Sequence, residues 1–159
     1  MTTSGFNAKF SEFLNISNDV IVANLKEFVV NPGAGQINAW KDSIKVLKSV
    51  ITKIITDNPK SKDNHVILEY LIPLETRRID AVFLLNGLIL IIEFKGKNIA
   101  SQADVDQALA YERDIKSYHA MSQTYPVETC LVLTKSNSNF REKNRNLNIL
   151  SADMLFQYC

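Results

Sequence analysis

Residues 78–95 of this chain read RIDAVFLLNGLILIIEFK and carry its strongest structural signal. This stretch consists of two apolar runs, residues 78–85 and 88–95, on either side of Asn86 and Gly87. An Asn-Gly pair between two such runs is the strongest short-range signal for a β-hairpin with a two-residue loop, in which both turn residues take positive φ. The sequence therefore predicts two antiparallel strands joined by a tight turn.

A two-residue loop also fixes which residues of the hairpin face each other. Val82 is then expected opposite Ile91, and Asp80 opposite Glu93. Opposed side chains project from the same face of a sheet, with Cβ atoms roughly 5 Å apart. Lys95 lies two residues beyond Glu93 and shares that face. We therefore predict one patch of sheet that carries Asp80, Glu93 and Lys95, all of which interrupt otherwise apolar runs.

Two carboxylates placed opposite each other need a cation between them, because like charges in that position destabilise a sheet and burial adds several kcal/mol. Mg²⁺ or Mn²⁺ meets this need, with hard oxygen ligands from Asp80, Glu93 and the backbone carbonyl of Phe94. Lys95 would then orient or activate the attacking water, or neutralise charge on a phosphate. The alternative is a structural ion network in which Lys95 or Arg78 pairs with the carboxylates.

The rest of the chain predicts an α/β fold with a mixed central sheet flanked by helices. We expect a three-strand meander, a crossover helix and a further strand. The expected helices cover residues 6–30 (one or two), 37–56 and 104–121, with one beginning at Ser151. The expected strands cover residues 65–72, 78–85, 88–95 and 127–134, with a short edge strand at 148–150.

The domain organisation follows from this order of elements. Residues 1–159 are expected to form a single domain, with a helical N-terminal region at about 6–56 and a core at about 37–150. The last helix barely starts before Cys159, which suggests a domain excised from a longer protein.

Composition excludes several classes of protein. The 159 residues are 46% hydrophobic and 22% charged, with a net charge of +1, which is typical of one ordinary globular domain. The two cysteines have no partners at metal-ligand spacing, so neither a zinc site nor a disulfide framework is expected. The N-terminus lacks the features of a signal peptide, and no window resembles a membrane span. We therefore expect a cytoplasmic protein without a membrane partner.

The order and spacing of several polar residues resemble the motif of the PD-(D/E)XK nuclease superfamily. Asp80 is followed after twelve residues by Glu93-Phe-Lys95, and the next helix carries Gln107 and Tyr111. The resemblance implies a restriction-endonuclease-like core. It also implies that Asp80 and Glu93 bind the metal, that Lys95 assists the nucleophilic water, and that Gln107 and Tyr111 support the site.

Many members of that superfamily supply another acidic residue from the first core helix. In this chain the candidates for that additional ligand are Glu12, Glu27, Asp42 and Glu69, and the sequence does not choose among them.

A narrower resemblance covers most of the chain. Residues 68–73, 78–80, 92–95 and 111–119 resemble nuclease-like domains that precede a helicase-like ATPase module in some bacterial proteins of the Schlafen-like group. The implied partner is such a module, in a longer chain or as a separate protein, and the implied role is defence or DNA processing. These residues contain no Walker A motif, so the motor would lie outside them.

The predicted activity is therefore metal-dependent hydrolysis of phosphodiester bonds in nucleic acid, with DNA as the expected substrate. Two basic segments suit this partner. Residues 41–62 hold six lysines and two aspartates, a charge of +4, and residues 135–145 carry +3 with Phe140 interleaved. Such segments contact phosphates, and Phe140 would stack on a base. Each segment alone equally fits a solvated helix face or a basic loop. The alternative function is a catalytically inactive module that binds nucleic acid or a partner protein.

Overall fold

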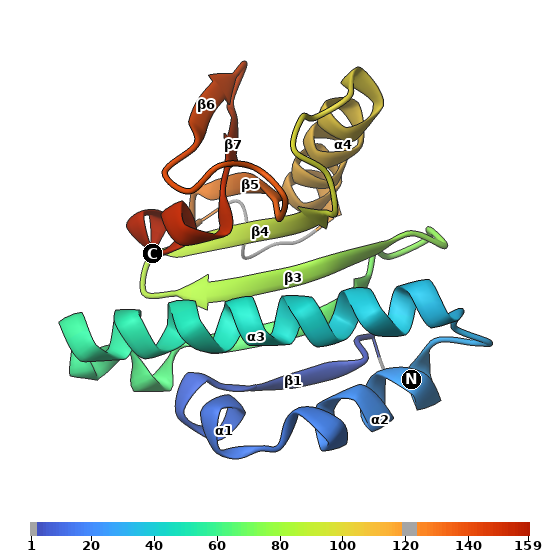
Figure 1. The fold of residues 1–159 in the computed structure, drawn as a ribbon, viewed down its shortest axis with the longest axis vertical. Helices are drawn as coiled ribbons and strands as arrows, with labels where there is room; N and C mark the ends of the chain where they lie inside the picture. Colours follow the sequence, from blue (N-terminus) through green and yellow to red (C-terminus); the bar gives the residue numbers. More distant parts are fainter. Residues whose placement is uncertain (1–2, 119–123) are drawn as a thin grey trace.

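The two apolar runs around Asn86 and Gly87 form strands β3 (Arg78–Leu85) and β4 (Leu88–Lys95) near the middle of a seven-stranded sheet (Figure 1). The computed structural model describes residues 3–118 and 124–159. The strand order is β1-β2-β3-β4-β5-β7-β6. The remaining strands are β1 (Phe6–Lys9), β2 (His65–Leu71), β5 (Val127–Leu133), β6 (Arg141–Asn144) and β7 (Leu147–Leu150).

Helices lie on both faces of this sheet, which confirms the predicted α/β class. They are α1 (Phe10–Asn15), α2 (Asn18–Phe28), α3 (Ala34–Asp57) and α4 (Gln102–Tyr118), with 3₁₀ segments η1 (Pro59–Asp63) and η3 (Ala152–Tyr158). No helix among the described residues is long and apolar enough to cross a bilayer.

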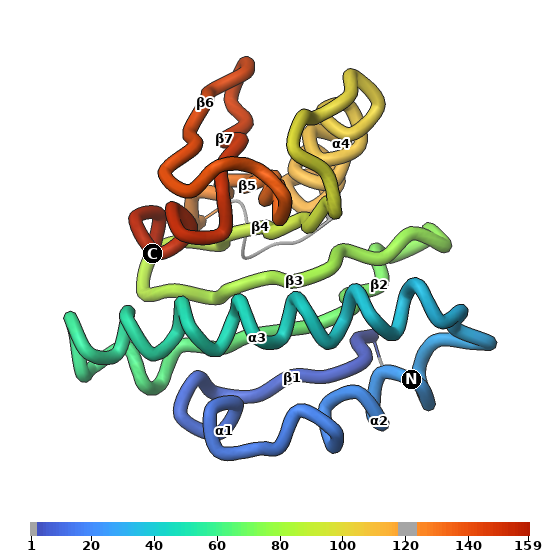
Figure 2. The backbone as a smooth tube through the Cα atoms, in the orientation of Figure 1, coloured from blue at the N-terminus to red at the C-terminus, as the bar shows by residue number. Residues whose placement is uncertain are grey.

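The two faces of the sheet have separate apolar cores. On one face, the stripe of α3 that includes Trp40 and Leu47 packs with Phe83 and Leu90 of the hairpin. On the other face, α4 packs against side chains that alternate with these, such as Ile91. Figure 2 shows the connection from β4 through α4 to β5, which pairs with β4 in parallel. The parallel pairing requires such a crossover.

The predicted hairpin register is confirmed. Val82 pairs with Ile91, and Leu85 pairs with Leu88 across the turn. One detail of the turn differs from the prediction, because Gly87 has a φ of 89° but Asn86 does not take positive φ. The loop still contains two residues, so the register is unchanged.

The expectation of helix from residue 6 is wrong at its start. Phe6–Lys9 forms β1, which pairs antiparallel with the first residues of β2, and α1 begins only at Phe10. The apolar spacing that indicated helix spans the junction between this strand and the helix. The exposed edge of β2 supplies backbone partners that local periodicity does not reveal.

The C-terminal strands also differ from the prediction. The segment expected as a short edge strand is β7, which lies inside the sheet between β5 and β6. The edge is β6, whose exposed charged sequence, REKN, carries no apolar alternation. The helix expected at 104–121 begins earlier, at Gln102, and its last predicted residues, 119–121, lie outside the described residues.

Candidate active site

The backbone pairing of β3 with β4 ends where the predicted carboxylates lie. Its last backbone pair is Ala81 with Ile92, and the next position in the same register holds Asp80 and Glu93. At this position, side-chain carboxylates rather than backbone carbonyls accept the hydrogen bonds between the two strands. The Asp80 N–H donates to Glu93 Oε1 at 2.9 Å, and the Phe94 N–H donates to Asp80 Oδ2 at 2.9 Å. Each carboxylate is therefore fixed by the backbone of the facing strand.

Strand β3 also reverses its faces at this level, whereas Leu90, Ile92 and Phe94 of β4 all pack on the α3 side. Ala81 packs in the core beneath α3, whereas Ile79, two residues earlier, packs in the core beneath α4. Residues two apart share a face in a regular strand, so the chain twists across Asp80. A cavity of about 210 Å³ lies at this level and is lined from both α3 and α4 as well as by Asp80 and Glu93.

Lys95 enters this cavity and is held by α4. Its Nζ donates to Gln107 Oε1 at 2.9 Å, and Gln107 Nε2 donates to Tyr111 Oη at 2.9 Å. Gln107 and Tyr111 are four residues apart, which places them on one helix face. The structure thus brings all five predicted catalytic residues to one cavity, with Asp80 and Glu93 on the hairpin and a Lys95–Gln107–Tyr111 chain beside them.

Of the four candidates for an additional acidic residue, only Glu69 lines the cavity. Glu12, Glu27 and Asp42 lie on α1, α2 and α3 and are not among its lining residues. Glu69 reaches it because its backbone takes a φ of 52°, a left-handed conformation that is uncommon for non-glycine residues.

Glu69 is 4% exposed, and its carboxylate is already engaged at both oxygens. The Trp40 indole N–H donates to Oε1 at 2.8 Å, and Arg78 Nε donates to Oε2 at 2.7 Å. Trp40 lies in the segment that the sequence predicts as a helix, residues 37–56, and has no predicted role in the site. Nothing in the local pattern shows that its N–H meets a carboxylate 29 positions along the chain.

The ionisation of the central pair is shifted strongly. Burial, reinforced by the nearby charge of Glu69, raises the pKa of Asp80 to about 6. Burial, followed by the charge of Asp80, raises the pKa of Glu93 well above its ordinary value. Burial and the charges of both carboxylates also raise the pKa of Tyr111 to about 12, so its phenol is neutral at physiological pH.

A direct ion pair does not account for the two carboxylates. Among the described residues, no lysine or arginine nitrogen lies within 4.0 Å of a carboxylate oxygen of Asp80 or Glu93. Arg78 pairs with Glu69 instead, and Lys95 pairs at 4.0 Å with Asp104. The charges of Lys95 and Arg78 do lower the pKa of Asp80 from a distance.

The donor set fits a hard divalent cation. In the part of the chain that the structure describes, no group of three or more His, Cys, Asp or Glu side chains is arranged to hold a metal. Mg²⁺, however, is commonly bound through one or two carboxylates together with water and substrate phosphates. Asp80 and Glu93 each use one carboxylate oxygen in the backbone bonds described above, which leaves the second oxygen of each for such a role.

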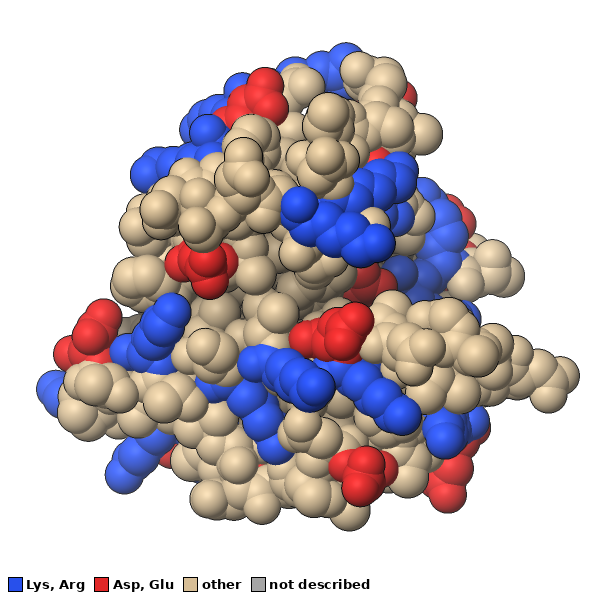
Figure 3. Space-filling model, viewed as in Figure 1, with Lys and Arg blue, Asp and Glu red and all other residues tan. Residues whose placement is uncertain are grey.

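The two basic segments are only partly next to the cavity. Residues of the N-terminal half of α3 line it, but Lys60 lies in a hollow beside the hairpin turn at Asn86. In the second segment, the Lys135 N–H bonds to the carbonyl of Lys97, whereas Arg141 lines a different hollow. Figure 3 shows basic side chains over α3 and over the opposite half of the molecule, with a hollow between them.

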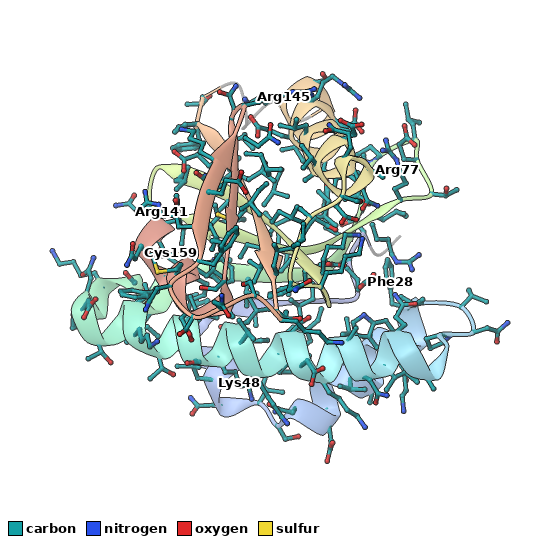
Figure 4. The ribbon with its side chains drawn as sticks, turned by 45° about the horizontal axis from the view of Figure 1, so that its top comes forward. Phe28, Lys48, Arg77, Arg141, Arg145 and Cys159 are labelled. Carbon is teal, nitrogen blue, oxygen red and sulfur yellow. The ribbon has the colours of Figure 1, made fainter. Side chains whose placement is uncertain are left out.

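Arg77 is a further basic residue that sequence reasoning did not assign. It leaves the β2–β3 connection toward α4 (Figure 4), where its guanidinium lies 2.7 Å from Asp114 Oδ2. The same guanidinium lies 5.5 Å from the centroid of the Tyr111 ring. These contacts hold the tyrosine end of the Lys95–Gln107–Tyr111 chain against the hairpin.

Comparison with known proteins gives little similarity. No protein-family model and no curated protein matches the sequence. Among solved structures, the chain is similar to protein VC1899 from Vibrio cholerae, with a TM-score of 0.41 and 16% sequence identity. The match covers 95% of this chain and 43% of that chain, so this chain spans less than half the length of its structural neighbour.

Proposed function

We propose that this domain is a metal-dependent nuclease of the PD-(D/E)XK type that hydrolyses phosphodiester bonds of nucleic acid, with DNA as the expected substrate. The observation that carries the proposal is the meeting of Asp80, Glu93 and Lys95 in one cavity between two helices. A buried and a half-buried carboxylate with raised pKa values, next to a lysine held by hydrogen bonds, are typical of functional sites.

Asp80 and Glu93 would hold Mg²⁺ or Mn²⁺, with the carbonyl of Phe94 as a further oxygen ligand. When bound, the ion supplies Lewis-acid stabilisation of the phosphate and lowers the pKa of water. The backbone bonds to both carboxylates keep their free oxygens oriented without the ion. This preorganisation reduces the cost of assembling the site.

Lys95 would act on the water and on the phosphate. Its side chain is 25% exposed, so the ammonium group remains accessible from the cavity. Gln107 Oε1 accepts one hydrogen bond from the Lys95 ammonium group. The other N–H donors of Lys95 are left to orient the attacking water or to offset charge that develops on the phosphate. Tyr111 fixes the Gln107 amide and so determines where Lys95 points.

Glu69 is assigned a supporting role in this proposal. Both its oxygens are used by Trp40 and Arg78, so the proposed ligand set does not include it. Its charge contributes to the raised pKa values of Asp80 and Glu93. The resemblance to domains that accompany helicase-like ATPase modules extends the proposal to DNA processing or defence beside such a module, in the cytoplasm.

A cleavage assay tests this function. Supercoiled plasmid and single-stranded circular DNA are incubated with the wild type in Mg²⁺, in Mn²⁺ and in EDTA. We expect cleavage only with the metal ions. Asp80→Asn, Glu93→Gln and Lys95→Met should each reduce the rate by about 100-fold or more.

The matched controls are Lys26→Met and Glu128→Gln, which alter an exposed lysine outside both basic segments and an exposed glutamate; neither residue lines the cavity. Both should cleave at the wild-type rate. A wild type that cuts neither substrate, or variants at Asp80 and Lys95 that cut as fast as it does, would leave a catalytically inactive binding module as the correct assignment.

A further inference from the structure

A second, more apolar groove lies beyond the lysine edge of the candidate site. Its volume is about 340 Å³, and its apolar walls include Ile99, Val105, Leu133 and Phe140. Ile99 is 73% exposed, and Phe140 is half-buried against the core beneath α4. The volume is at the lower end of the range for small-ligand pockets. The Phe140 ring and the exposed Ile99 in this lining provide apolar surface suited to a flat ring.

This groove is connected to the candidate site through neighbouring backbone segments. The Thr134 N–H donates to the carbonyl of Lys95 at 3.0 Å, and the Lys135 N–H donates to the carbonyl of Lys97 at 3.1 Å. The groove begins at the next residue, Asn98. It therefore lies at the carboxyl ends of β4 and β5, the place where open α/β sheets bind their ligands.

Two lysines lie next to the groove's lining residues in the chain: Lys97 precedes Asn98, and Lys135 follows Leu133 by two residues. Lys97 is 47% exposed and pairs with Asp104 at 2.8 Å. Lys135 is exposed and makes no ion pair with the residues that the structure describes. The lining residues on β6 include Glu142 and Asn144. An anionic group is thus favoured beside the lysines, and an uncharged ring with hydrogen-bonding edges away from them.

We propose that this groove is a nucleobase subsite, in which one unpaired base of a nucleic-acid strand stacks on Phe140 while the adjoining phosphate contacts Lys135. This inference rests on the proposed function, because it places the groove on the path of the substrate. Aromatic stacking beside cationic side chains is how proteins bind single strands without reading their sequence. The Asn98 and Asn144 amides offer donors and acceptors to the edges of the base.

A binding experiment in EDTA tests the subsite separately from cleavage. Fluorescence anisotropy measures the affinity for a labelled thymidylate strand of about twelve nucleotides and for an abasic sugar-phosphate strand of equal length. We expect the wild type to bind the abasic strand about 5- to 150-fold more weakly, the range for one stacked base. Phe140→Ala should lose a similar factor on the thymidylate strand and nothing on the abasic strand. Phe140→Tyr should restore the difference between the strands.

Salt dependence tests the phosphate contact. Lys135→Ala should lower the slope of log affinity against log salt by about 0.7, the value for one phosphate of a single strand. Lys26→Ala, at an exposed lysine of α2 outside both basic segments, should leave the slope unchanged.

Three results would overturn the subsite. They are no measurable binding of either strand, equal wild-type affinity for both strands, and a Phe140→Ala loss that is the same on both. If the protein cleaves DNA but binds the thymidylate and abasic strands equally well, the nuclease proposal stands and the subsite proposal fails. If it binds the thymidylate strand more tightly but cleaves nothing, the subsite proposal stands and the nuclease proposal fails.

Discussion

Asp80 and Glu93 are tied together through the backbone, because Glu93 Oε1 accepts the N–H of Asp80 at 2.9 Å. Asp80 Oδ2 in turn accepts the N–H of Phe94, the residue after Glu93, at the same distance. Two acidic side chains thus take the place of one rung of the β-ladder. This arrangement satisfies two backbone donors, but it gathers negative charge in a buried position.

Asp80→Asn should stabilise the metal-free protein in a pH-dependent way. Burial raises the pKa of Asp80 to about 6, so the folded protein binds protons more tightly than the unfolded chain, and stability falls as pH rises from about 4 through about 6. The variant should therefore be more stable than the wild type at about pH 7.5, by on the order of 2 kcal/mol, and lose this advantage near pH 4. Urea unfolding in EDTA at the two pH values measures the difference.

Glu128→Gln is the control for that experiment, because it removes an exposed carboxylate outside the cavity. Its effect on the free energy of unfolding should be small at both pH values. A destabilised Asp80→Asn protein at neutral pH would show that the Asp80 charge is stabilised by contacts that outweigh its burial.

Mn²⁺ should raise the stability of the wild type by linkage. A ligand that binds only the folded state adds about 2.7 kcal/mol when present at 100 times its dissociation constant. The melting temperature should rise with Mn²⁺ concentration for the wild type and for Glu128→Gln, and stay constant for Asp80→Asn and Glu93→Gln. A melting temperature that Mn²⁺ shifts equally in all four proteins would place the metal elsewhere.

Trp40→Phe should destabilise the protein by removing the donor to a buried carboxylate. An unsatisfied buried group costs about 1–3 kcal/mol, and more when it is charged. The loss should be smaller in a Glu69→Gln background, where the abandoned acceptor is neutral. Urea unfolding of the two single variants and the double variant gives the coupling energy. Equal losses in both backgrounds would mean that Trp40 acts through packing alone.

Gly87→Ala should weaken the hairpin that positions the carboxylates. Gly87 has a φ of 89°, and an added Cβ there would meet no atom within 4 Å, so the cost is conformational and about 1 kcal/mol. Gly35→Ala is the matched control, since its added Cβ also meets nothing, but it lies in the first turn of α3. That change should be neutral or stabilising by up to about 1 kcal/mol. Thermal unfolding distinguishes the two signs.

Local sequence was sufficient to predict the hairpin and the face that it presents. A two-residue loop and a two-residue period leave one register that keeps the apolar side chains buried, and Asp80 and Glu93 follow from it. The helix that carries Gln107 and Tyr111 was also predicted. Because the two residues are four apart, a helix at this place puts both side chains on one face.

Other parts of the prediction failed for a common reason. Phe6–Lys9 was expected to be helical, and β7 was expected at an edge. The strand at Phe6–Lys9 depends on the unpaired backbone groups of β2, and the place of β7 depends on the pairing of β6 with it. No stretch of a few residues contains that information.

The meander, its register and the pair of opposed carboxylates are therefore predictable from short segments, because each depends on contacts between residues close together in the chain. That Glu69, rather than Glu12, Glu27 or Asp42, joins the carboxylates follows only from the folded molecule. That choice depends on a left-handed backbone at Glu69 and on the Trp40 indole that meets its carboxylate. Such a contact exists only after α3 has packed across the sheet, and the energy of that packing comes from the whole apolar face of the helix rather than from either residue.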